Sequence, residues 1–150
     1  MKRRWVAVIA AVLAVWMGGY AFLTRSPDAT AYRELCVQAA QDALDGLGTA
    51  RLSAGPVGDP ELVGTYTTSM LDDAQKLIGG ARASLAGPVP PDVASARLRD
   101  KVTPLLDRAE RGYQDLAMAR AEGDTNAQYA AAQRMQPTED QLRAFVERYR

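Results

Sequence analysis

The chain has 150 residues, enough for a single domain, and its 18 basic and 18 acidic residues leave no formal net charge. This balance argues against a nucleic-acid-binding protein, whose usual signature is a clustered positive excess. Histidine is absent and Cys36 is the one cysteine, so the chain lacks the commonest general base, the commonest metal ligand and any internal disulfide.

The first feature along the chain is an uncharged run from Trp5 to Leu23 that follows three basic residues. As a helix, this run would measure about 28 Å, close to the roughly 30 Å thickness of a bilayer core. Basic flanks are retained in the cytoplasm, so we expect residues 1–25 to be a cytoplasmic basic segment and a transmembrane signal-anchor. Residues 26–150 would then form an extracytoplasmic domain of a single-pass membrane protein, tethered to the bilayer through Trp5–Leu23.

The same segment has a second interpretation, as a signal peptide that is removed. Its apolar run is longer than the usual signal-peptide core of about 7–15 residues, which favours a permanent anchor. Small residues typical of a cleavage site nevertheless occur at Ala29-Thr30-Ala31 and, less clearly, at Gly19-Tyr20-Ala21. Cleavage after Ala31 or Ala21 would release a secreted protein, and both interpretations export the rest of the chain.

Two helices are expected in the first half of the exported part, where apolar residues recur at helical spacing. The first follows Ser26-Pro27, a plausible cap and first-turn proline, and ends at the turn cluster 55–60. The second has Tyr66 and Leu77 on its apolar stripe and continues to Leu85. Its Gly79-Gly80 pair predicts a kink or a close helix contact, because each glycine costs about 1 kcal/mol relative to alanine inside a helix.

A third helix is expected after the proline-rich connector 87–91, starting near Asp92. Its stripe of apolar residues is the clearest in the chain and keeps its phase through Pro104, which predicts a kink rather than a break. Thr103-Pro104 could also cap a new helix start.

A fourth helix is expected after Gly123, which suits a left-handed helix end, with Asp124 or Thr125 as its cap. Thr138 and Gln141 form a capping-box pattern, so this helix can restart after Pro137.

These segments predict an all-α fold: an N-terminal transmembrane helix followed by an antiparallel four-helix bundle with proline and glycine kinks. Short turns between amphipathic helices favour antiparallel neighbours. A coiled-coil rod fits less well, because prolines and glycines interrupt the heptads too often.

No group of side chains has the pattern of a catalytic or metal site. Asp72 and Asp73 point about 100° apart on a helix, and their spacing to Lys76 is that of a solvated ion pair. The same spacing occurs at Asp107 with Arg111 and at Glu139 with Arg143. None of the glutamates lies clearly on an apolar stripe, and Cys36 and the serines have no histidine partner. We therefore expect no enzyme, no cofactor and no metal.

Tyrosines are the first candidates for contacts with a ligand or partner. Tyr32, Tyr66 and Tyr113 fall on the apolar stripes, so their rings are expected to fill the core with hydroxyls at its rim. Alternatively, they line a ligand pocket, with room for a small molecule between helices near Gly112.

Arg97, Arg99 and Lys101 form a basic cluster beside the proline-rich connector. We expect a solvated surface balanced by nearby aspartates, with contact to anionic headgroups or wall polymers as the alternative. Cys36 is expected to be a small buried residue, and the alternative is a disulfide that joins two chains.

The sequence thus predicts a non-catalytic, membrane-tethered helical bundle that contacts another envelope protein or acts in envelope assembly. The preference for arginine over lysine suggests a bacterial source. Binding of a small ligand, in a sensory or carrier role, is the alternative, and a secreted bundle is a third. An enclosed pocket would favour the ligand, whereas a solid core with exposed apolar residues would favour a protein partner.

Overall fold

The computed structural model describes residues 28–54 and 60–150, and this part of the chain is all-helical, as predicted. It contains helices α2 (Ala29–Ser53), α3 (Pro60–Ala86), α4 (Val93–Ala121) and α5 (Thr125–Tyr149), with no strand among the described residues. The predicted membrane anchor, Trp5–Leu23, lies outside the described residues. None of the four described helices is both long and apolar enough to cross a membrane.

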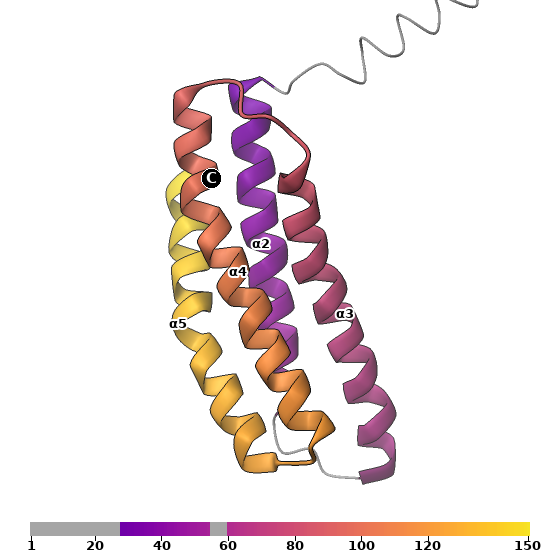
Figure 1. Ribbon diagram of the computed structural model, residues 1–150. Helices are drawn as coiled ribbons and strands as arrows, with labels where there is room; N and C mark the ends of the chain where they lie inside the picture. The colour runs from indigo at the N-terminus through magenta and orange to yellow at the C-terminus, as the bar shows by residue number, and fades with distance from the viewer. Residues whose placement is uncertain (1–27, 55–59) are drawn as a thin grey trace, which may run out of the picture.

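Successive helices run in opposite directions and form an antiparallel bundle (Figure 1). Helices α2 and α4 each contact all three other helices, whereas α3 and α5 do not touch each other. We call the end where α2 begins, beside the connector 87–92, the proximal end. The opposite end, where the turn 122–124 joins α4 to α5, is the distal end.

Aspartate side chains begin three of the helices. Asp28, Asp92 and Asp124 each accept a hydrogen bond from the backbone N–H three residues later, at 2.7–2.9 Å. Such caps satisfy backbone donors that have no partner inside the helix. The predicted starts at Asp92 and Asp124 are confirmed, whereas α2 is capped by Asp28 and not by Ser26. Gly123 has a φ of 71°, the left-handed conformation expected there.

Prolines do not divide the last two helices. Pro104 lies inside α4, as predicted, and Pro137 lies inside α5, so the predicted restart after Pro137 is wrong. Thr138 is buried instead of capping a new helix. Met135 and Leu142, on either side of Pro137, pack into the same core, and this packing outweighs the roughly 3 kcal/mol cost of an internal proline.

Helices α2 and α3 pack closely because α2 presents alanines and a glycine to the core. A Cβ atom placed on Gly46 would lie 2.8 Å from Ile78 Cγ1 and 3.1 Å from the carbonyl oxygen of Ala74. The sequence placed a close contact or kink at Gly79-Gly80, but α3 runs continuously through both, and a Cβ on either would meet nothing within 4 Å. The close helix contact is therefore made by Gly46.

The buried face of α3 matches the predicted one only in part: Leu85 is buried as expected, together with Ala74 and Ala81. Tyr66 and Leu77 were expected in the core, but Tyr66 is 65% exposed and Leu77 is also exposed, whereas Thr67 and Ile78 are buried. The Ile78 side chain packs against Gly46, which has no side chain to obstruct it. This contact determines which side of α3 faces α2.

Candidate functional site

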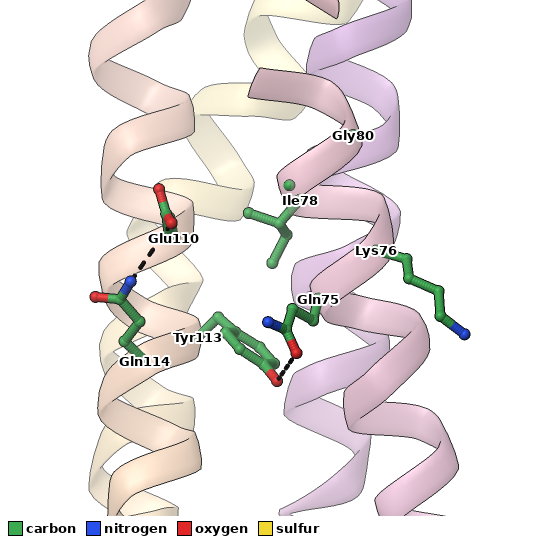
Figure 2. A pocket seen from close by; sticks show the side chains of 8 residues that line it. Gln75, Lys76, Ile78, Gly80, Glu110, Tyr113 and Gln114 are labelled. Atoms are coloured by element: carbon green, nitrogen blue, oxygen red, sulfur yellow. Dashed lines mark hydrogen bonds between the residues drawn. The ribbon is translucent and has the colours of Figure 1, made fainter. Parts of the chain in front are cut away.

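A groove of about 400 Å³ lies between α3 and α4 (Figure 2). Eight residues line it: Gln75, Lys76, Ile78, Gly79, Gly80, Glu110, Tyr113 and Gln114. Helix α3 supplies the first five and α4 the last three. The groove opens at the surface, and we call it the α3–α4 groove.

On the α3 side, the groove is open because Gly79 and Gly80 have no side chains to fill it. Ile78 is almost fully buried and forms an apolar floor, while Gly79 and Gly80 have open space where side chains would lie. On α4, Tyr113 points across the groove toward Gln75 (Figure 2). The groove therefore combines an apolar floor, an aromatic ring and polar groups at its rim.

The polar groups of the groove are joined by long hydrogen bonds. The Tyr113 hydroxyl donates to Gln75 Oε1 at 3.4 Å, and Gln114 Nε2 donates to Glu110 Oε1 at 3.4 Å. Both distances exceed the usual range of about 2.7–3.2 Å, so the bonds are weak. Burial raises the pKa of Tyr113 above its ordinary value of 10.0, and the carboxylate of Asp72 adds to this effect. Tyr113 therefore remains a neutral donor at physiological pH.

The charged groups at the groove already have partners within the protein. Arg82 of α3 pairs with Glu110 and, at 3.1 Å, with Asp107 of α4. Lys76 pairs with Asp73 at 3.4 Å and extends away from Tyr113 (Figure 2). The two charged residues that line the groove, Lys76 and Glu110, are thus both paired within the protein.

Polar contacts continue along the rest of the interface between α3 and α4. Beyond Arg82, toward the proximal end, lies a smaller hollow of about 160 Å³ lined by Leu85 and Leu106 among others. Toward the distal end, Arg120 donates a hydrogen bond to Thr67. The two helices are therefore joined by side-chain polar groups, in contrast to the close alanine and glycine packing between α2 and α3.

The three candidate tyrosines do not form one site. Tyr32 is completely buried near the proximal end, and its hydroxyl has no hydrogen-bond partner among the described residues, so it does not reach the rim as predicted. Burial raises its pKa, with smaller contributions from Cys36 and Asp100 and an opposing one from Arg99. Tyr66 is exposed near the distal end, and Tyr113 is the one of these three tyrosines that lines the groove.

The predicted basic cluster is divided. Arg97 is exposed, and Arg99 pairs with the neighbouring Asp100 at 3.4 Å. Lys101 turns instead toward α5, where its Nζ donates to the Tyr149 hydroxyl at 2.8 Å and lies 5.5 Å from the ring centroid. The hydrogen bond from Lys101 lowers the pKa of Tyr149.

The predicted ion pairs are confirmed only at Asp73 with Lys76. Asp107 pairs with Arg82 and not with Arg111. Glu139 was assigned to a solvated pair with Arg143, but its side chain is only 4% exposed and accepts a hydrogen bond at 3.0 Å from Arg51 of α2. This correction had a signal in the sequence: Glu139 follows Met135 by four residues and precedes Leu142 by three, on the buried stripe.

Within 28–54 and 60–150, no group of three or more aspartate, glutamate and cysteine side chains is placed to hold a metal ion.

The chain matches no protein-family model, no curated protein sequence and no solved structure.

Proposed function

We propose that the protein is a non-catalytic bundle, tethered to the outer face of a cell membrane, that binds another protein of the cell envelope. The observation that carries the tether is the uncharged run Trp5–Leu23 behind three basic residues. The absence of histidine from the sequence and the pairing of the groove's charges support a non-catalytic role.

Exposed apolar side chains at the distal end support a protein partner. Each of the four helices places one large apolar residue there, with 38–69% of its surface exposed: Leu52, Tyr66, Met118 and Tyr129. Single exposed apolar residues are common on protein surfaces, so the support comes from their occurrence on all four helices at this end of the bundle. Helix α2 begins at the opposite end, so a tether before it would let the distal end extend away from the bilayer.

The partner can be tested in cells that make the full chain. A photo-crosslinking amino acid at position 66 or 118 should capture one and the same partner. The same probe at position 93, where Val93 is exposed at the proximal end, is the matched control and should not capture that partner. Equal capture from all three positions, or none, would contradict the proposal.

The fate of the N-terminal segment needs its own measurement. The tethered protein should stay in the membrane after alkaline extraction and keep its N-terminal residues. A soluble chain that begins at Phe22 or Tyr32 would establish the alternative, a secreted bundle released by cleavage.

A second candidate function, binding of a small ligand, is favoured by the α3–α4 groove. Its volume of about 400 Å³ falls within the range of about 300–1,000 Å³ typical of small-molecule sites. The two functions are compatible, because the groove and the distal apolar residues use different side chains.

A further inference from the structure

The glycine pair in α3 is not explained by packing within the chain. Gly46 and Gly112 are needed where they lie, because an added Cβ would approach Ile78 and Met135 at 2.8 and 3.1 Å, respectively. Gly79 and Gly80, in contrast, face open space. Glycine is less favourable than alanine in a helix interior. Gly79 and Gly80 therefore lower the stability of α3 without a packing reason. Because they have no side chains, the α3 side of the α3–α4 groove stays open.

The chemistry of the groove favours a neutral ligand. Its carboxylate and ammonium groups, Glu110 and Lys76, are paired with Arg82 and Asp73. A charged ligand would have to displace one of these internal partners. A neutral ligand competes only with the long hydrogen bonds of Gln75 and Gln114.

The groups that remain available are those that recognise hydroxyls. Gln75 and Gln114 carry amides, each able to donate and to accept, and Tyr113 adds a hydroxyl. Their present hydrogen bonds of 3.4 Å are weak enough to be exchanged for bonds to a ligand. Beside them, the partly buried Tyr113 ring offers an apolar surface, and the buried Ile78 lies beneath the groove.

We propose that the α3–α4 groove binds a neutral carbohydrate. The apolar face of a sugar ring would lie against the Tyr113 ring, and its hydroxyls would bond to the amides of Gln75 and Gln114. The space over Gly79 and Gly80 would hold the rest of the sugar. This assignment rests on the second candidate function and is independent of the membrane tether.

Calorimetric titration of the purified full chain, without sugar-based detergents, tests the assignment. The probes are di-N-acetylchitobiose, cellobiose and maltose, and at least one should bind. Gly79 follows Gln75 by four residues, so the side chain of a Gly79→Leu variant projects on the same helix face and fills the groove. This variant should weaken binding by at least about tenfold.

Gly48→Leu is the matched control, because Gly48 is also a helical glycine with open space around it, on α2 and away from the groove. It should bind the sugar as the unmodified chain does, and thermal melting followed by circular dichroism checks that both variants fold. Equal losses in the two variants would overturn the groove as the site.

Two further results would contradict the assignment in different ways. Binding of spermidine or citrate that Gly79→Leu abolishes, without binding of any sugar, would keep a ligand site and overturn its carbohydrate class. If none of these probes gave a heat of binding, both the carbohydrate class of the ligand and the second candidate function would be overturned.

Discussion

Cys36 shows how burial decides the chemistry of a single side chain. It lies on the core face of α2 with no exposed surface. Burial raises the pKa of its thiol from 9.0 to about 11, although Arg99 acts in the opposite direction. Because the thiolate is the reactive form, the folded protein holds this cysteine in an unreactive state. A disulfide with a second chain would require the thiol to leave the core.

We therefore predict that a thiol reagent labels the folded chain at about pH 8 at least a hundredfold more slowly than the chain unfolded in guanidinium. The measurement is the rate of colour release from Ellman's reagent. Equal rates, or ready formation of a disulfide-linked dimer on non-reducing gels, would contradict the burial of Cys36.

The same shift predicts a pH dependence of stability. Since the folded-state pKa of Cys36 lies above the unfolded value, the unfolded chain loses its thiol proton first as the pH rises. The stabilisation is complete below about pH 9 and is lost between about pH 9 and 11. Urea denaturation should therefore show the advantage of the original chain over a Cys36→Ala variant shrinking across this window. A constant difference would contradict the shift.

Arg51 and Glu139 form an ion pair with one buried and one half-exposed partner. The Glu139 side chain is 4% exposed and that of Arg51 44%. An Arg51→Met variant keeps most of the apolar stem but leaves the buried carboxylate without its donor. We expect it to lower the free energy of unfolding by about 2 kcal/mol, measured by urea denaturation. Adding Glu139→Gln should recover part of this loss, because the neutral amide is less costly to bury.

Arg143→Met provides the matched control for Arg51. Arg143 pairs with Asp140 at 3.0 Å, but both side chains are more than half exposed. Such surface pairs contribute about 0–1 kcal/mol, so this variant should change stability little. If the Arg51 and Arg143 variants lowered the free energy of unfolding equally, loss of the arginine partner would cost no more at the buried Glu139 than at the exposed Asp140.

At the scale of helices, two glycines of α2 that lie two residues apart should respond oppositely to alanine. Gly46→Ala places a Cβ 2.8 Å from Ile78 Cγ1 and 3.1 Å from a backbone oxygen of α3. We expect a loss of about 1–3 kcal/mol, typical of overpacking. Gly48→Ala meets no neighbour and should raise stability by up to about 1 kcal/mol. Thermal and urea unfolding measure both, and a stabilised Gly46→Ala chain would contradict the close packing of α2 on α3.

Prediction from the sequence succeeded for helices whose apolar residues occupy one face. The buried stripes of α2 and α4 were predicted in the right phase, because polar residues fill their other faces. Helix α3 has apolar residues on two adjacent faces, so its periodicity alone did not distinguish Tyr66 and Leu77 from Leu71 and Ile78. The choice depends on Gly46 of another helix, which no local pattern reveals.

The candidate site was less predictable than the helices. Of its lining residues, the sequence singled out Tyr113 as a possible ligand contact and the glycine pair as a structural feature. The groove itself depends on how far apart α3 and α4 lie, which is determined by packing between helices and not by a local sequence pattern. Pro137 was misjudged for a related reason, since packing across the bundle outweighs a local break.

At the scale of the whole molecule, the proposed tether joins one end of the bundle and not the other. The apolar run ends at Leu23, and the five residues to Asp28 span at most about 18 Å when fully extended. Helix α4 has 29 residues and is about 43 Å long, so the two ends of the bundle are well separated. If the anchor stays in the bilayer, the proximal end must lie near the lipid and the distal end can extend away from it.

This orientation predicts unequal quenching by lipids. Val93 at the proximal end and Met118 at the distal end are both largely exposed, and the buried Cys36 does not compete for a label. Val93→Cys and Met118→Cys variants of the full chain, each carrying the same fluorophore, are placed in nanodiscs with spin-labelled headgroups. The label at 93 should be quenched several-fold more strongly, because quenching needs close approach and the distal end lies about 40 Å farther away. The unlabelled lipid is the control. Equal quenching would mean that the bundle lies flat on the membrane and would contradict a distal end held toward a partner.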